Sequence, residues 1–203
     1  MSEHQKLVEE TEGEEYFHED VWCVVQRQIE YAEANSKGAL YDDLTAMIFA
    51  FHAIEGYLNY LGEKIAHDVW CDEKTEFKGN NVTGKLAVLC ERCGLAEPNY
   101  GKRPYSTIVE LKKLRNAVVH PKTRKINCKV EYSEHKPPPL FRKSYLSEVV
   151  SHCKAIRARD DVNDIADKLH TAAREKFPKA QLTSRALGGI MALYGGTTRR
   201  AKI

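Results

Sequence analysis

The sequence predicts an all-α fold: one domain, residues 1–203, built as a helical bundle of four or five helices. Apolar residues recur every three or four positions over several long segments, which is the spacing of a buried helix face. Clusters of Gly, Asn and Pro separate these segments and mark turns. At 203 residues the chain is long enough to bury one core, and it contains no internal repeat that would suggest a second domain.

Two helices are expected in the first third of the chain. The acidic segment 1–14 precedes them, and we expect it to be frayed. One helix should run from Phe17 to Ala34 and the next from Tyr41 to Trp70, which would be roughly 45 Å long if it is unbroken. Gly56 and Gly62 should bend this second helix or let another helix approach it closely.

Two further helices are expected before residue 122. Lys85 to Cys93 forms a short helix closed by Gly94, a common C-terminal stop. The next helix should end at His120, because Pro121 forces the residue before it out of the α region.

The remainder of the chain is expected to be less regular. Alternation at 126–132 predicts a short strand or extended arm, followed by three prolines that exclude helix. A mostly polar helical stretch should run from Tyr145 to about Lys176. The small and basic tail, 188–203, should be loosely ordered unless RNA or a partner holds it.

The charge is unevenly distributed. The formal charge is +2, but residues 1–20 hold eight acidic residues and one lysine, so the rest of the chain holds 30 basic and 21 acidic residues. A basic body favours a polyanionic partner such as RNA, although scattered lysine and arginine also keep surfaces soluble. No apolar stretch approaches the ~18 residues that span a bilayer, so we expect a cytoplasmic protein with no membrane association and six reduced cysteines.

The strongest functional signal is the hexapeptide from Arg115 to His120. It places a fixed cation, the amide of Asn116 and an imidazole within one and a half helical turns. Asn116 and His120 share a helix face, and Arg115 lies about 140° from His120 at ~100° per residue. Unpaired carbonyls at the helix end favour the positive imidazolium.

This trio could cleave RNA without a metal or any other cofactor. RNA carries its own nucleophile, the 2′-hydroxyl, so cleavage needs a base, an acid and a cation for the phosphate. His120 would transfer protons, Arg115 would stabilise the phosphate and Asn116 would orient it. A two-fold homodimer would bring two such helices together and supply the second histidine. The alternative is that Arg115 pairs with a surface carboxylate and His120 merely caps the helix.

The segment Leu111–Pro121 resembles the RNxxxH helix of the HEPN superfamily of helical ribonuclease and nucleotide-binding domains. Phe51–Asn59 is similar to the family's long early helix, and Gly84–Cys90 is similar to its short intervening helix. The resemblance implies a HEPN-type endoribonuclease of the toxin or host-defence kind. It further implies a homodimer, RNA as the substrate and an inhibitory protein partner.

The resemblance also implies roles for individual residues. Arg115 and His120 would be catalytic, with Asn116 beside the arginine. Glu55 and Asn59 would support the dimer cleft; the alternative is a solvated or hydrogen-bonded helix face. Toxin members often carry a tyrosine two positions after the histidine as an acceptor of modification, but this chain has Lys122 there.

Two other sequence patterns are weaker evidence for a functional site. The run Gly79–Lys85 fits the core of a phosphate-binding loop, but a leucine stands where Ser or Thr is required, which favours a turn with a helix start. A set of one histidine and three cysteines has spacings that a zinc site could use, but apolar neighbours favour packed thiols; its members are His67, Cys71, Cys90 and Cys93.

The alternative to an enzyme is a catalytically silent helical dimer that binds RNA, a nucleotide or a protein partner. A third hypothesis is a structural module in which the motif only supports dimerisation.

Overall fold

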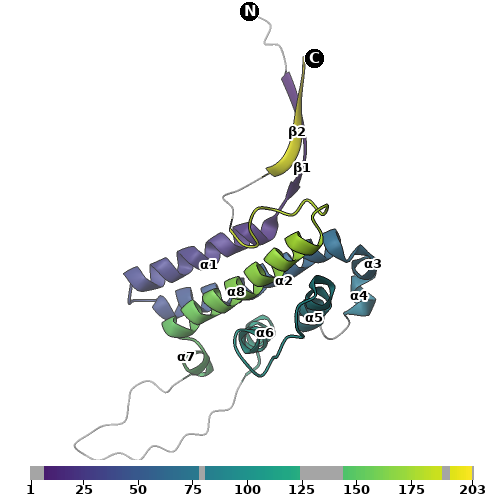
Figure 1. The fold of residues 1–203 in the computed structure, drawn as a ribbon. Helices are drawn as coiled ribbons and strands as arrows, with labels where there is room; N and C mark the ends of the chain where they lie inside the picture. Colours follow the sequence, from purple (N-terminus) through teal and green to yellow (C-terminus); the bar gives the residue numbers. More distant parts are fainter. Residues whose placement is uncertain (1–6, 78–80, 124–143, 189–192, 203) are drawn as a thin grey trace, which may run out of the picture.

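The computed structural model describes residues 7–77, 81–123, 144–188 and 193–202. The fold is mostly helical (Figure 1), in agreement with the all-α prediction. Its elements are β1 (Leu7–Glu15), α1 (Phe17–Ala34), α2 (Ala39–Ile65), α3 (His67–Trp70), α4 (Glu73–Glu76), α5 (Asn81–Cys93), α6 (Tyr105–Val119), α7 (Tyr145–Val149), α8 (His152–Lys176) and β2 (Leu193–Lys202). No helix within the described ranges is long and apolar enough to cross a membrane.

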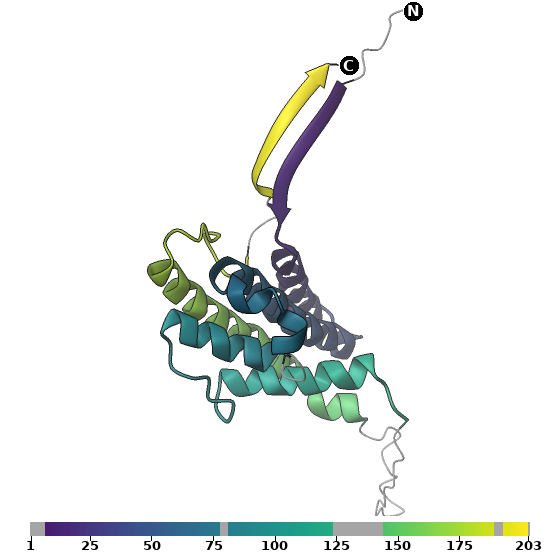
Figure 2. The ribbon, with the colours of Figure 1, turned by 90° about the vertical axis from the view of Figure 1, so that its right-hand side faces the viewer.

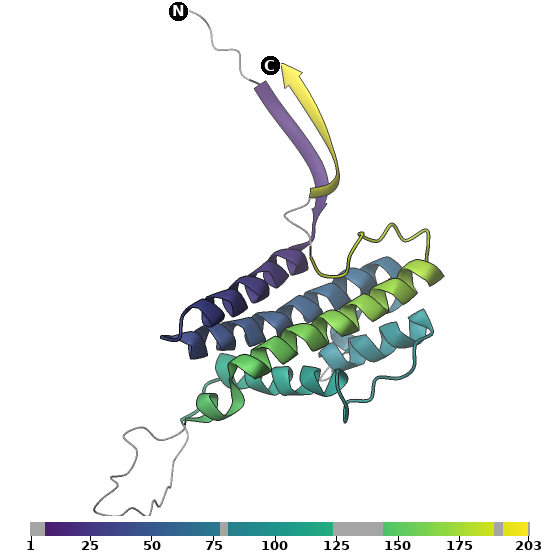
Figure 3. The same ribbon diagram turned by 60° about the vertical axis from the view of Figure 1, so that its left-hand side comes forward.

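Helix α2 is the centre of the bundle. It packs against α1, α5, α6 and α8, and Figures 2 and 3 show these helices arranged around it. Its side chains Ile54, Tyr57, Leu58 and Leu61 are completely buried. Burying apolar surface is worth about 25 cal/mol per Å², so these side chains make α2 a main contributor to the core.

The second helix ends earlier than the sequence suggested, at Ile65 instead of Trp70. The chain turns at Ala66 and α3 then brings the indole of Trp70 back onto the end of α2. A Cβ on Gly62 would lie only 1.9 Å from the Trp70 ring, so the missing side chain of Gly62 makes room for the indole. The prediction that Gly62 allows a close approach is therefore correct, but the group that approaches it is the side chain of Trp70 rather than another helix.

The C-terminal ends of α5 and α6 agree with the sequence predictions, although α5 begins at Asn81, four residues before the predicted Lys85. Gly94 follows Cys93 with φ +75°, the left-handed conformation that glycine adopts without a steric cost. Helix α6 ends at Val119 and His120 is its C-cap, with its backbone N–H donating to the carbonyl of Asn116 at 3.1 Å.

The segments predicted to be frayed (1–14) and loose (188–203) contain, in their described parts, the strands β1 and β2. Strands β1 and β2 pair antiparallel and form a two-stranded ribbon that projects from the bundle (Figure 1). The register places Glu9 opposite Arg200 and Glu10 opposite Arg199. Acidic residues near the N-terminus are therefore paired across the ribbon with basic residues near the C-terminus. This pairing could not be predicted from either segment alone. The predicted arm at 126–132 lies outside the described residues.

The predicted helix from Tyr145 to Lys176 is divided in two. Val150 and Ser151 are extended, and Val150 is buried between α7 and α8. Helix α7 lies beside the C-terminal half of α6 (Figures 2 and 3).

Candidate functional site

The C-terminal turns of α6 carry the predicted catalytic residues. Ile108, Leu111 and Leu114 are buried and fix this helix on the bundle. After Leu114 no side chain of α6 is fully buried: Arg115 and Ala117 are partly buried, and Asn116 and the residues from Val118 to His120 are exposed. Packing at i, i+3 and i+6 therefore holds one face and presents the motif on the other.

Arg115 and Asn116 are joined by a hydrogen bond. Nη1 of Arg115 donates to Oδ1 of Asn116 at 3.2 Å. The guanidinium is half-buried, and its Nε is buried without a hydrogen-bond partner among the described residues. An arginine carries four N–H groups on its two Nη atoms, and the bond to Asn116 uses one of them, so the other Nη donors remain for an anion such as phosphate.

His120 is exposed at the end of α6, one helical turn after Asn116. Val118 and Val119 precede it and are 38% and 48% exposed, two of the few large apolar side chains on the described surface. Within the described ranges, no hydrogen bond joins the His120 ring to Arg115. The site in one chain is thus an exposed imidazole, an apolar patch and an oriented guanidinium on a single helix end.

Glu55 and Asn59 lie one turn apart on α2, where the sequence placed them as supporting residues. Oε2 of Glu55 lies 3.7 Å from Nδ1 of His52, and Oδ1 of Asn59 accepts a hydrogen bond of 2.6 Å from Nζ of Lys85. Among the described residues, no hydrogen bond or ion pair connects either of them to the trio on α6. Both face a cavity instead.

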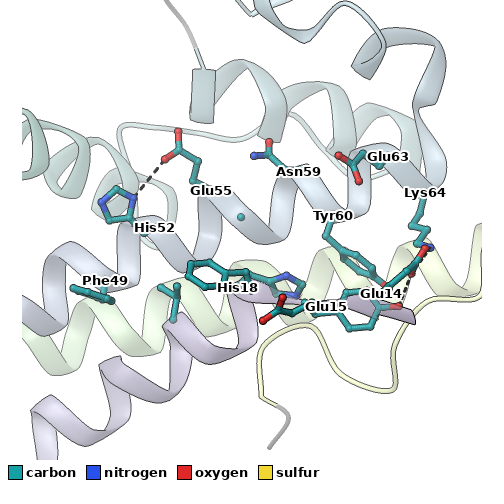
Figure 4. Close-up of a pocket in the computed structure, with 14 residues that line it drawn as sticks. Glu14, Glu15, His18, Phe49, His52, Glu55, Asn59, Tyr60, Glu63 and Lys64 are labelled. Atoms are coloured by element: carbon teal, nitrogen blue, oxygen red, sulfur yellow. Dashed lines mark hydrogen bonds and ion pairs between the residues drawn. The ribbon is translucent and has the colours of Figure 1, made fainter. Parts of the chain in front are cut away.

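This cavity, the α1–α2 cavity, occupies about 1100 Å³ where the end of β1, the start of α1 and the middle of α2 meet (Figure 4). Its lining contains the glutamates Glu14, Glu15, Glu55 and Glu63 and the lysine Lys64. Lys64 donates two hydrogen bonds of 2.8 Å to Glu14, which lower the pKa of that carboxyl. The excess of carboxylates makes the cavity unsuitable for RNA phosphates, in contrast to the end of α6.

Two buried histidines were missed by the sequence analysis. Burial lowers the pKa of His18 to about 4, against the opposing effect of a hydrogen bond to the backbone of Ala186. Burial also lowers the pKa of His170. Nε2 of His170 lies 3.0 Å from the carbonyl oxygen of Thr183, so it carries the proton, and Nδ1 accepts from the hydroxyl of Tyr57 at 3.2 Å.

The phosphate-loop candidate is incompatible with the position of its lysine. Lys85 is only 2% exposed, and its ammonium pairs with Glu73, binds Asn59 and lies 5.8 Å from the centre of the Phe77 ring. A phosphate would have to displace these partners from a buried site. Gly79, at the start of the candidate loop, lies outside the described residues.

The zinc candidate is not assembled. Cys90 and Cys93 are buried, and burial raises the pKa of each thiol to about 11, whereas His67 and Cys71 are exposed. The described part of the chain holds no group of three or more His, Cys, Asp or Glu side chains arranged to bind a metal ion.

Comparison with known proteins supplies no relative. No family model, curated protein or solved structure matches the chain.

Proposed function

We propose that the chain is a HEPN-type, metal-independent endoribonuclease of the cytoplasm, active as a homodimer. The observation that carries the proposal is the arrangement at the end of α6. There the half-buried guanidinium of Arg115 is hydrogen-bonded to Asn116, one turn before an exposed imidazole. The free thiols of the described cysteines suit a reducing compartment.

The chemistry follows from the residues. One imidazole of His120 accepts the proton of the 2′-hydroxyl, and the resulting 2′-oxygen attacks the adjacent phosphorus. The P–O5′ bond breaks, a second imidazole protonates the leaving 5′-oxygen, and the products are a 2′,3′-cyclic phosphate and a 5′-hydroxyl. Arg115 stabilises the extra negative charge on the phosphate oxygens, an effect strengthened by its partial burial.

A homodimer supplies the second imidazole. Val118 and Val119 expose apolar surface between Arg115 and His120, and an isologous contact through this patch would bring both copies of the trio around one phosphate. Asn59 would then act indirectly, through the hydrogen bond from Lys85 that joins α2 to α5, whereas Glu55 contacts His52 on its own helix.

The proposal is tested by incubating a labelled single-stranded RNA with the protein in excess EDTA. We expect cleavage in EDTA and a loss of about 100-fold or more in rate for His120→Ala, the usual contribution of a proton-transfer group. Arg115→Ala should reduce the rate comparably. Lys113→Ala is the matched control, because Lys113 is an exposed cation on the same helix.

The outcomes are distinguishable. Cleavage that persists in His120→Ala at the wild-type rate rejects the assignment. RNA binding without turnover, equally weakened by Arg115→Ala and Lys113→Ala, indicates instead a silent RNA-binding dimer. An inhibitory partner would be expected to cover the same end of α6.

A further inference from the structure

We propose that His152 is a pH-sensitive clamp, whose charged imidazole holds the start of α8 to α1 and α2 and so keeps α7 against the end of α6. The clamp joins three helices through one side chain. It does not depend on RNA cleavage. Its effect on the cleavage rate rests on the proposed function, because α6 carries the catalytic trio.

The imidazole of His152 lies between two carboxylates from different helices. Its Nδ1 is 2.9 Å from Oδ1 of Asp43 on α2, and its Nε2 is 3.5 Å from Oε1 of Glu33 near the end of α1. A neutral imidazole has one N–H and one lone pair, so it can donate to only one of these oxygens. The charged form has an N–H on each nitrogen and is therefore the form that satisfies both carboxylates.

The contact with Asp43 sets the direction of the pH dependence. The Asp43 side chain is only 4% exposed, so little water is available to replace a lost partner. The hydrogen bond to Asp43 raises the pKa of His152 against the smaller effect of burial, and the charges of Asp43 and Glu33 add to the rise. The folded chain therefore holds this proton more tightly than the unfolded chain, and the clamp is lost as the pH rises through the folded pKa.

The start of α8 determines the position of α7. Helix α7 has five residues, far fewer than an isolated helix needs in water, so it depends on its contacts with the rest of the fold. Val150 joins the two helices and is buried. Nζ of Lys154, in the first turn of α8, donates to the backbone carbonyl of Glu148 on α7 at 2.7 Å. A contact that holds the first turn of α8 thus also holds α7.

The start of α8 also lies at the catalytic end of α6. Oγ1 of Thr107 donates to Asp161 at 2.5 Å. One turn later along α6 and one turn earlier along α8, Arg157 donates to Glu110. The two helices therefore run antiparallel, and the first turn of α8 is at the same end of the bundle as the last turns of α6. Figures 2 and 3 show α7 beside α6 there. The cation of those turns, Arg115, is bonded within its own helix.

Amide hydrogen exchange of α7, followed by mass spectrometry and corrected for the intrinsic effect of pH, tests the clamp. In the wild type, α7 should exchange about threefold faster at about pH 8.5 than at about pH 6, as expected from one partly exposed ion pair. His152→Gln keeps an N–H donor but has no charge, so its α7 should exchange fast at both pH values. The control His67→Gln removes an exposed imidazole on α3 and should behave like the wild type.

The titration of the imidazole, followed by NMR, is a second measurement. The midpoint for His152 should lie above the ordinary value of 6.5 in the wild type. In Glu33→Gln, a substitution of a side chain that is 56% exposed, it should move toward that value. Glu30→Gln is the matched control, because it removes an exposed carboxylate from the same helix, and it should leave the midpoint in place.

The effect on the α6 site is measured as the ratio of the wild-type cleavage rate to the His152→Gln rate, in which the titration of His120 cancels. The ratio should be about three at about pH 6 and fall toward one at about pH 8.5. A ratio of one at both pH values would overturn the control of the site by the clamp.

Equal exchange of α7 in the wild type and His152→Gln at the lower pH would overturn the clamp itself, as would a His152 midpoint that Glu33→Gln leaves unmoved. A protein that cleaves no RNA would instead reject the proposed function, and the exchange and the midpoint would still decide whether the clamp exists.

Discussion

The side-chain oxygen of Asn59 lies 2.6 Å from the buried ammonium of Lys85, so two residues that the sequence offered for separate chemistry bind each other. Asn59 was a candidate beside the dimer cleft, and Lys85 was the lysine of a phosphate-loop pattern. Together with Glu73 they tie α2 to α4 and α5. Lys85 therefore has a structural role, and its removal should lower the stability of the fold.

Lys85→Ala should destabilise the protein by about 3 kcal/mol, because it leaves Asn59 without its donor and opens space beside Phe77. Urea denaturation measures the change. Lys113→Ala, at an exposed position, should lie within about 0.5 kcal/mol of the wild type. A Lys85→Ala protein as stable as the control would show that the ion pair has no structural role.

Gly62→Ala should cost about 3 kcal/mol, since its methyl group would overlap the Trp70 ring and force it out of its place. A double-mutant cycle isolates the contact: in a Trp70→Ala background, Gly62→Ala should cost less than about 1 kcal/mol, as in an exposed helix without the clash. Equal costs in both backgrounds would mean that the two residues do not touch.

Stability should fall as the pH is lowered from about 6.5 to about 4. His18 has its pKa lowered to about 4 in the folded chain, and the pKa of His170 is lowered too, so the unfolded chain binds more protons in this range. The stability that these two neutral imidazoles contribute is fully present above their pKa in the unfolded chain. It is lost as the pH falls toward their lower pKa in the folded chain. For His18 the loss is about 3 kcal/mol.

Chemical denaturation at a series of pH values measures this dependence. His152 acts in the opposite sense, because Asp43 and Glu33 raise its pKa and its contribution is lost as the pH rises. His152→Gln should therefore leave the acid-side decline intact. A wild-type stability that is constant between pH 6.5 and 4 would contradict the burial of neutral His18 and His170.

Val118→Asp/Val119→Asp should convert the proposed dimer to a monomer and reduce RNA cleavage in parallel, because charged groups in an apolar contact lose hydration without compensation. Analytical ultracentrifugation and cleavage assays on the same samples provide the comparison. Thr171→Asp, at an exposed position on α8, is the control for an added negative charge. A wild-type protein that is monomeric at the concentrations of the cleavage assay would refute the shared-cleft mechanism.

Local signals were sufficient to predict most of the helical fold. Periodicity located α1 and α5, and the proline after His120 fixed the end of α6, because these features depend on neighbouring residues. The break at Ala66 could not be predicted, since it depends on the later return of Trp70 to Gly62.

Contacts between distant segments account for what the sequence missed. The pairing of β1 with β2 joins residues 178 to 195 positions apart, from Glu15 with Leu193 to Leu7 with Lys202, and no local pattern indicates the partner of either strand. The hydrogen bond of the buried His18 to the backbone of Ala186 likewise joins residues far apart in the chain. For the candidate site, the sequence located the trio on α6, whereas the cavity beside Glu55 depends on the fold.

The most direct test of the central claim is the single-turnover cleavage of RNA in EDTA after the cut position has been mapped and its 2′-hydroxyl replaced by 2′-O-methyl. The account predicts that the unmodified RNA yields a 2′,3′-cyclic phosphate and that the modified position is not cut. Cleavage of the modified RNA at that position would contradict the assignment of Arg115 and His120 to 2′-hydroxyl chemistry.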